Sequence, residues 1–214
     1  MSDVKILVVY YSMTGNVAQL AKAVAEGAQR AGAEVRIRQV AELMPEEELR
    51  KRPVLLGIKD QYKHIPLASN ADLEWADGVA FGSPTRYGNM TAQLKEFIDQ
   101  TGKLWLAGTL TGKLASVFTS TATQHGGQES TLISMMVPLF HLGFIIQGFP
   151  YVEQSQMSME GIHGGSPYGI SSVSGPMAQR PPTKLDLDMA AALGKRLAEN
   201  AAKLRKPSEK ARAA

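Results

Sequence analysis

The chain has 214 residues, of which 44% are hydrophobic and none is cysteine, and its formal charge is +3. This length suits one α/β domain and is short for two. The lack of cysteine excludes disulfides, thiolate zinc sites and Cys-x-x-Cys redox chemistry. Residues 203–214 carry a net charge of +4, which leaves −1 for the rest of the chain. A nucleic-acid reader should carry basic residues on its fold, so we expect no nucleic-acid partner.

We expect residues 1–204 to form a single domain and residues 205–214 to form a flexible basic tail. The apolar runs are strand-sized, far below the ~20 residues of a membrane span. The first run starts within a few residues of the N-terminus and leaves no space for a signal peptide. These features favour a cytoplasmic protein without a membrane span.

The most informative segment joins an apolar run, residues 6–11, to an amphipathic helical pattern that starts at Val17. Backbone N–H groups and hydroxyls in such a turn lie at the positive end of a helix dipole, where a phosphate binds. The turn contains no lysine, so it suits a phosphate that is held permanently. It therefore predicts a bound nucleotide cofactor, held by Ser12, Met13, Thr14, Gly15, Asn16 and Val17.

Strands and helices alternate along the rest of the chain. Strands are predicted at residues 34–40, 78–84, 113–120 and 143–150, and helices at 90–99, 128–141 and 183–204, the last with Thr183 as its N-cap. This alternation predicts an open parallel sheet with helices on both faces. Ligands bind such sheets outside the carboxyl ends of the strands.

Two long loops interrupt this pattern. Residues 41–74 form a polar connection in which Pro45 and three glutamates could start a short helix. Residues 151–182 are rich in glycine, proline and serine and show neither helical nor strand periodicity. Loops of this length are usually functional or disordered. We favour an ordered lid or a subunit contact for residues 151–182.

Two further strand ends carry polar loops. Pro84, Thr85, Arg86 and Tyr87 follow the third strand, where an arginine and an aromatic ring could meet a planar cofactor. In the alternative interpretation this is an ordinary turn with Asn89 as the N-cap of the next helix. The other loop follows the fourth strand and contains Ser120, Thr121, Ala122, Thr123, Gln124 and His125, before a glycine pair that permits close backbone approach. It could also be a simple helix-capping loop.

Competing motifs are missing from the sequence. It contains no G-x-G-x-x-G, no Walker A loop and no G-x-S-x-G elbow, and its four histidines lack metal-ligand spacing. The pattern leaves the roles of two single residues undecided. Trp105 fits a core or a site position, and His141 fits the last turn of a helix, where it would complement the helix dipole.

Together these segments resemble the flavodoxin-like NAD(P)H:quinone oxidoreductases of the WrbA type, over nearly the whole chain. The similarity lies in residues 10–16, 82–90, 99–105, 120–129 and 164–169. It implies a flavodoxin-like, doubly wound, five-stranded parallel sheet of order 2-1-3-4-5. It also implies non-covalent FMN, a homotetramer formed as a dimer of dimers, and two-electron reduction of quinones by NADH or NADPH.

By matched position, the resemblance places residues 12–17 at the FMN phosphate and Thr85, Arg86 and Tyr87 at the isoalloxazine. Residues 120–125 would flank the ring and the ribityl chain. His141 would reach a neighbouring subunit's flavin site, and Trp105 would face the substrate. Thr14 departs from the tyrosine that many relatives carry there, where it helps to seat the nicotinamide.

The flavin would carry the chemistry in a ping-pong cycle, in which the nicotinamide passes hydride to flavin N5 before the quinone binds. Arg86 and His125 give the three loops a positive character, with Glu129 as their only acid. A positive environment favours the anionic two-electron form of the flavin. Two alternatives remain: a flavodoxin-like single-electron carrier, and a regulatory protein that binds flavin without turnover.

Overall fold

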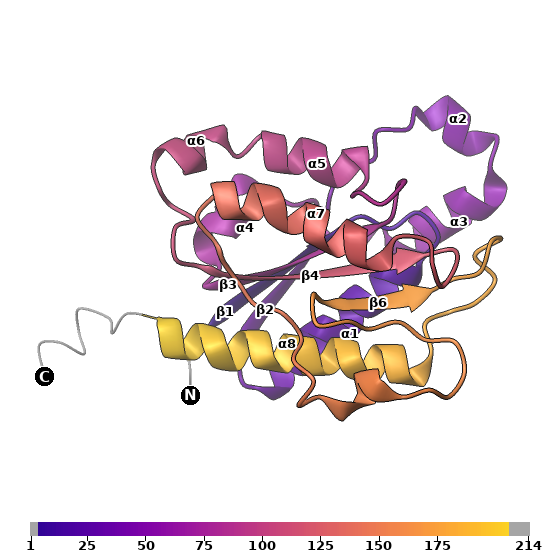
Figure 1. Ribbon diagram of the computed structural model, residues 1–214. Coiled ribbons are helices and arrows are strands. Elements are labelled where there is room, and N and C mark those ends of the chain that lie inside the picture. Colours follow the sequence, from indigo (N-terminus) through magenta and orange to yellow (C-terminus); the bar gives the residue numbers. More distant parts are fainter. Residues whose placement is uncertain (1–3, 206–214) are drawn as a thin grey trace, which may run out of the picture.

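A computed structural model describes residues 4–205, apart from the side chains of residues 154 and 155. The predicted tail lies outside the described residues, except for Arg205. The chain folds around a parallel sheet (Figure 1) in the order β2-β1-β3-β4-β5, with β6 also paired to β4. The strands are β1 Lys5–Tyr10, β2 Glu34–Gln39, β3 Gly78–Pro84, β4 Leu114–Thr121, β5 Ile145–Ile146 and β6 Ile170–Val173.

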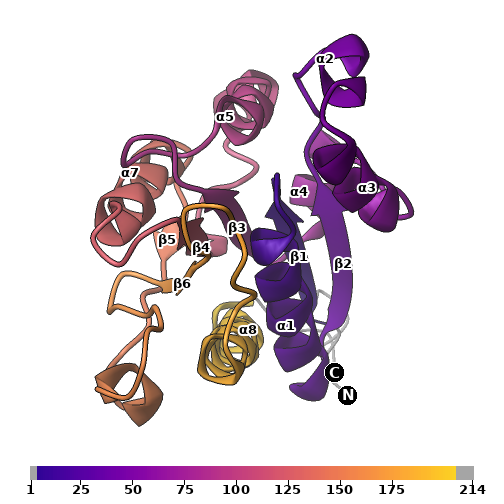
Figure 2. The same ribbon diagram turned by 90° about the vertical axis from the view of Figure 1, so that its right-hand side faces the viewer.

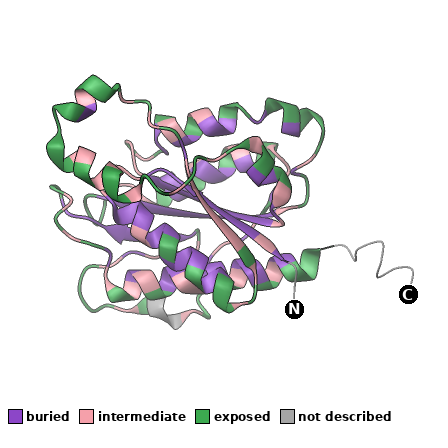
Figure 3. Cartoon of the chain, turned by 180° about the vertical axis from the view of Figure 1, so that it is seen from behind, coloured by how far each residue is buried: buried purple, intermediate pink, exposed green. Residues whose placement is uncertain are grey.

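Helices cover both faces of the sheet, as predicted (Figure 2). α1 Asn16–Arg30 and α8 Lys184–Leu204 lie on one face, whereas α4 Asn70–Trp75, α5 Ala92–Asp99 and α7 Gln128–His141 lie on the other. Alternate residues of β1 face opposite sides because side chains alternate along a strand, so Tyr10 packs with α1 and Tyr11 with the other layer. The strands β1, β3, β4 and β6 are almost wholly buried, whereas the edge strand β2 has no fully buried residue, and the long helices α1 and α8 each bury one side (Figure 3).

The fifth strand position differs from the prediction. Residues 143–150 were expected to form one strand, but only Ile145 and Ile146 pair with β4, opposite Leu114 and Ala115. The chain then leaves the sheet, and β6 returns to pair with Phe118–Thr121 at the other end of β4. The segment 151–182 therefore contains a strand, although its sequence shows no strand periodicity.

The polar connection 41–74 is more helical than expected. A short helix does follow Pro45, as predicted: α2 Glu46–Arg50. α3 Pro53–Tyr62 and α4 follow it, and α4 begins with a capping box between Ser69 and Asp72. Proline at the first helical position and a Ser-x-x-Asp pattern are both helix-start signals. The sequence therefore does contain signals for the starts of α3 and α4.

Two helix starts test the capping predictions. Thr183 caps α8, and its hydroxyl accepts a hydrogen bond from the Asp186 amide at 3.1 Å. Asn89 does not cap α5; Thr91 takes that position, two residues later. The short helices α6 Gly102–Leu106 and η1 Gln154–Met157 complete the fold. Across residues 4–205, no helix combines the length and apolarity needed to cross a bilayer.

Candidate functional site

The three polar loops meet at the carboxyl ends of β1, β3 and β4, toward which the arrows of β4 and β6 point in Figure 1. They enclose a cavity of about 210 Å³. Most of the predicted cofactor residues line it: Ser12, Met13, Thr14, Asn16, Val17, Pro84, Thr85, Arg86, Ser120, Thr121 and Ala122. The structure therefore brings together residues that lie more than 100 positions apart in the chain.

The first loop presents its backbone amides to this cavity. Gly15 precedes α1 with φ 88°, a left-handed conformation, and its amide donates to the Ser12 hydroxyl at 3.1 Å. Within residues 4–205, the amides of Met13, Thr14, Asn16 and Val17 donate to no protein acceptor. Unpaired amides at a helix N-terminus are the donor set that a phosphate satisfies.

The second loop is a tight turn with an unusual backbone. Tyr87 has φ 54° although it is not glycine, and its side chain is fully exposed. The loop is held because Arg86 and Asn89 exchange backbone hydrogen bonds of 2.7 and 3.0 Å. An exposed aromatic residue in a strained conformation is typical of a functional position.

Arg86 provides the positive charge of the cavity lining. Its guanidinium donates to the Thr85 carbonyl at 2.8 Å and contacts the Met13 sulfur at 3.2 Å. The side chain thereby spans from the second loop to the first. A cation at this position attracts negative charge that builds up on a bound group.

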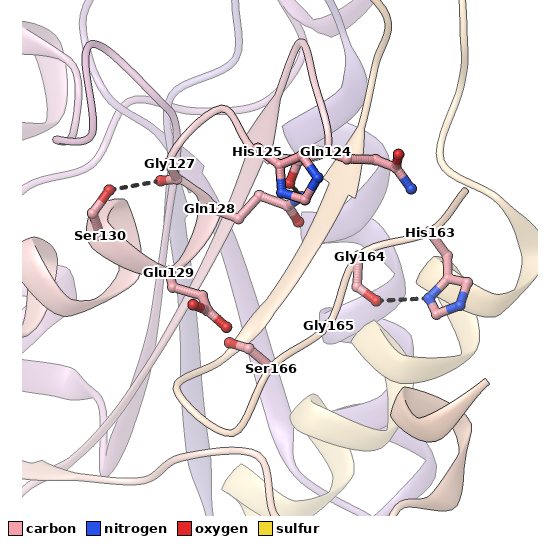
Figure 4. Close-up of a pocket in the computed structure, with 10 residues that line it drawn as sticks. All are labelled: Gln124, His125, Gly127, Gln128, Glu129, Ser130, His163, Gly164, Gly165 and Ser166. Atoms are coloured by element: carbon pink, nitrogen blue, oxygen red, sulfur yellow. Dashed lines mark hydrogen bonds between the residues drawn. The ribbon is translucent and has the colours of Figure 1, made fainter. Parts of the chain in front are cut away.

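The third loop divides between two cavities. Ser120, Thr121 and Ala122 line the first one. Gln124 and His125 instead line a neighbouring cavity of about 490 Å³, together with residues 163–166 (Figure 4). Thr123 is exposed, and its carbonyl accepts from the Thr121 hydroxyl at 2.7 Å.

The second cavity is less suited to a ligand than its size suggests. Both ring nitrogens of His163 lie against backbone carbonyls, Nδ1 at 2.9 Å from Gly164 (Figure 4) and Nε2 at 2.8 Å from Ser158. Gln128 donates to the Gln124 carbonyl at 2.8 Å. The His163 ring and the Gln128 side-chain amide are thus already engaged with main-chain carbonyls of the protein.

Residues that the sequence analysis missed complete the first cavity. Ser174, Gly175, Pro176 and Ala178 also line it. They are held there because the Ser174 amide donates to the Thr121 carbonyl at 2.8 Å, which continues the pairing of β6 with β4. The glycine- and proline-rich composition of residues 151–182 indicated a functional segment, but it did not indicate which residues.

Trp105 and His141 lie elsewhere on the chain. They line a shallow depression of about 490 Å³ between α5, α6 and α7, with Val137 and Pro138. Among the described residues, this depression and the first cavity share no lining residue. Trp105 is 58% exposed. Within one chain, these two residues are therefore not part of the cavity formed by the three loops.

A partly buried carboxylate, that of Glu42, supports the base of the first loop. Glu42 accepts hydrogen bonds from the Tyr11 hydroxyl and the Gln93 amide, each at 2.8 Å, and forms an ion pair with Lys59. Burial alone would raise the pKa of Glu42, but the hydrogen bonds it accepts, the one from Lys59 above all, outweigh burial and lower it to about 2. Burial and the hydrogen bond to Glu42 raise the pKa of Tyr11.

The fold defines the class of the protein: a parallel sheet of order 2-1-3-4-5, with a polar, lysine-free loop between β1 and α1, is the fold of a flavodoxin-like protein. The chain belongs to the NADPH-dependent FMN reductase family, which matches residues 4–156. Two solved structures share the fold. They are a flavodoxin, WrbA-like protein from Agrobacterium tumefaciens (TM-score 0.64, 22% identity, 94% of this chain and 99% of that one) and a flavodoxin from the domain Archaea (TM-score 0.58, 19% identity, 92% and 99%).

Other relatives, with higher sequence identity to this chain than these two structures, are named as enzymes. NAD(P)H dehydrogenase (quinone) from Aromatoleum aromaticum is 47% identical over 201 residues, which cover 94% of this chain and 97% of the relative. The protein of the same name from Geotalea uraniireducens is 48% identical over 203 residues, which cover 94% and 98%. The predicted resemblance is thereby confirmed.

Proposed function

We propose that this protein reduces quinones to hydroquinones with two electrons from NADH or NADPH, by means of non-covalently bound FMN. The observation that carries this proposal is the set of unpaired amides between Met13 and Val17 at the start of α1. They form a lysine-free anion site in a chain that is 47% identical to a quinone-reducing dehydrogenase.

The first loop would hold the FMN phosphate. The amides of Met13, Thr14, Asn16 and Val17 would donate to its oxygens, and the hydroxyls of Ser12 and Thr14 are available at the same cavity. Gly15 supports this arrangement because its left-handed conformation turns the chain sharply into α1. The helix dipole adds a favourable interaction with the dianion.

The second and third loops would orient the isoalloxazine ring. Thr85, Arg86 and Tyr87 would contact it on one side, and residues 120–125 would flank the ring and the ribityl chain. Bound FMN would accept a hydride from the nicotinamide and then pass two electrons to the quinone. The charge of Arg86 stabilises the anionic reduced cofactor, which favours an enzyme over a single-electron carrier.

The two substrates would use one site in turn, next to the exposed Tyr87 ring. Thr14 would take the place at which many relatives carry tyrosine for the nicotinamide, so the choice between NADH and NADPH is open to measurement. Trp105 would face the substrate and His141 would approach the flavin of a neighbouring subunit. Neither residue lines the cavity of its own chain, which supports contacts of both residues with a neighbouring subunit.

We also propose a homotetramer, assembled as a dimer of dimers. Apolar side chains are exposed along α6 and α7, among them Trp105, Ile133, Val137 and Phe140. Several large apolar side chains exposed on neighbouring helices are a feature of protein interfaces. The cytoplasmic location stays a prediction.

Turnover tests the proposal directly. Purified protein reconstituted with FMN should oxidise NADH or NADPH rapidly when benzoquinone is present and slowly when it is absent. The protein should also become yellow as FMN binds in a one-to-one ratio. A yellow protein that is inactive with both nicotinamides would be a flavin-binding regulatory protein, and a colourless one would contradict the site itself.

A further inference from the structure

We propose that a separate cavity, between α1, β2 and the end of α3, binds a small aromatic carboxylate. The cavity measures about 390 Å³, within the range of roughly 300–1,000 Å³ that is usual for ligand pockets. Its lining comprises Tyr10, Ala18, Lys22, Ile37, Gln61, Tyr62, His64 and Ile65. None of these described residues lines the cavity of the three loops, and the proposal does not depend on turnover.

Two phenol groups need a partner in this cavity. Tyr10 lies at the end of β1 and is only 2% exposed, yet its hydroxyl forms no hydrogen bond with any residue of the described chain. The Tyr62 hydroxyl lacks one among those residues as well. Neither hydroxyl oxygen is fully enclosed by the protein, so both remain free to donate to a ligand that supplies acceptor atoms.

Both phenols act as donors at neutral pH. Burial, and to a smaller extent the nearby Tyr62, raises the pKa of Tyr10 to about 12, and burial also raises the pKa of Tyr62. Both hydroxyls therefore keep their protons and can donate hydrogen bonds to a ligand in the cavity. A carboxylate, with two oxygens that only accept, matches this pair.

The charge of the lining favours an anion. Lys22 and His64 are at the cavity, and the described residues that line it include neither aspartate nor glutamate. The Lys22 ammonium is only loosely engaged, at 4.0 Å from Glu26 on the solvent side of α1. An anionic head group would therefore meet donors and the charge of Lys22, for which Glu26, outside the lining, competes only loosely.

The remaining walls indicate an aromatic body. Ala18, Ile37 and Ile65 supply apolar surface, and the two tyrosine rings supply flat faces on which a ring can stack. Tyr62 also borders the phosphate loop: a Cβ built on Gly15 would lie 3.9 Å from its hydroxyl. The proposed ligand would thus bind next to the loop that receives the phosphate.

Benzoate is the probe for this site. FMN-saturated protein is used so that benzoate cannot enter the flavin cavity, and binding is followed by calorimetry and by NMR of tyrosines labelled at Cζ. We expect one saturable site, with the Tyr10 and Tyr62 resonances shifting together. Benzamide, which has the same shape without the charge, should bind about tenfold more weakly. No saturation up to about 10 mM benzoate would overturn the proposal.

Matched variants locate the site. Tyr10→Phe removes one hydroxyl and keeps the ring, and Lys22→Met removes one charge; each should weaken benzoate binding, about tenfold for Tyr10→Phe. Tyr151→Phe and Lys195→Met are the controls, because Tyr151 is exposed on the long loop and Lys195 pairs with Glu199 on α8 as Lys22 pairs with Glu26 on α1. Equal affinity in all four variants would place benzoate elsewhere and refute the proposal.

Discussion

The Asn16 side-chain amide donates to the main-chain carbonyl of Arg180 at 2.7 Å, across 164 residues of chain. Asn16 is the first residue of α1 and is almost fully buried. Arg180 follows closely on Ser174, Gly175, Pro176 and Ala178, which line the same cavity as the first loop. This single hydrogen bond therefore joins the two sides of the proposed phosphate site.

Replacing Asn16 should weaken FMN binding without unfolding the protein. Asn16→Ala removes the donor, leaves the Arg180 carbonyl unpaired and releases residues 174–180 from the first loop. A lost buried hydrogen bond costs about 1–3 kcal/mol, so we expect the Kd for FMN to rise roughly tenfold or more. Quenching of flavin fluorescence during titration of the apoprotein measures this Kd.

Asn70 offers a matched control for Asn16. It is also the first residue of a helix, and its amide also donates to a main-chain carbonyl, that of Gln100 at 3.2 Å. It lies far from the cavity lining, so Asn70→Ala should leave the Kd for FMN unchanged. An equal loss of FMN affinity in both variants would mean that Asn16 acts through general stability and not through the site.

Glu42 is expected to stabilise the fold in a pH-dependent way. Glu42→Gln removes the acceptor for Tyr11 and the partner of Lys59, and should lower the free energy of unfolding by about 1–3 kcal/mol at pH 7. The folded-state pKa of Glu42, about 2, lies below its ordinary value of 4.5. The contribution of Glu42 is therefore complete above about pH 4.5 and is lost as the pH falls toward 2.

Urea unfolding of both proteins at several pH values tests this sign. The difference in unfolding free energy between wild type and Glu42→Gln should be constant from pH 7 to pH 5 and should shrink as the pH falls further. Glu47→Gln is the control, since Glu47 is exposed on α2 and pairs with Lys51 at the surface. A difference that grows in acid would contradict the assignment.

The loops at the carboxyl ends of β1, β3 and β4 could be predicted because each lies directly between a strand and a helix. Ser12–Val17 follows an apolar run and precedes an amphipathic one, so local sequence places it at the sheet edge. The alternation predicts a parallel sheet, whereas the order of its strands comes from the resemblance to a known family. The confirmed flavodoxin-like fold thus depends on signals that span fewer than 20 residues each.

The rest of the cavity could not be predicted, because long-range pairing decides it. Ser174 reaches the site only because Val173 of β6 pairs with Thr121, 52 residues earlier, and four residues of mixed polarity give β6 no periodic signal. Residues 147–150 leave the sheet where Phe149 donates to the Pro167 carbonyl at 2.9 Å. The positions of Trp105 and His141 outside the cavity depend on the packing of three helices, which local sequence does not encode.

The backbone of Tyr87 is strained and its side chain is exposed. A substitution at this position should therefore affect stability and function differently. Tyr87→Asn places a residue that tolerates the left-handed region at φ 54°. We expect the free energy of unfolding of the apoprotein to stay equal or to rise by about 0.5 kcal/mol. FMN affinity and kcat/KM for benzoquinone should both fall. Loss of stability without loss of activity would remove Tyr87 from the proposed site.

The apolar surface of α7 should control assembly. Val137→Asp and Phe140→Glu place charges on side chains that are 51% and 60% exposed in the single chain, and burying a charge in an interface is unfavourable. Sedimentation analysis should show a tetramer for the wild type and smaller species for both variants. Val54→Asp, on the exposed side of α3, should stay tetrameric. A monomeric wild type would contradict the assembly itself.

Two glycines allow α1 and α8 to cross closely. A Cβ built on Gly27 would lie 1.9 Å from the Ala191 carbonyl oxygen, and one built on Gly194 would lie 1.9 Å from the Val24 carbonyl oxygen. Gly27→Ala or Gly194→Ala must therefore push the two helix backbones apart. We expect either substitution to lower the free energy of unfolding by about 2 kcal/mol or more, measured by chemical denaturation of the apoprotein.

Gly57 gives the opposite result for the same substitution. It lies within α3, is exposed, and among the described atoms nothing lies within 4 Å of a Cβ built on it. Gly57→Ala should therefore raise the free energy of unfolding by about 0.5–1 kcal/mol, because alanine is the better helix former. Equal effects at Gly57 and Gly27 would show that helix propensity, and not the α1–α8 contact, decides both. All three glycines lie inside helices, so helix propensity acts on them alike. The expected changes in unfolding free energy differ in sign because only Gly27 and Gly194 lie at the close α1–α8 contact.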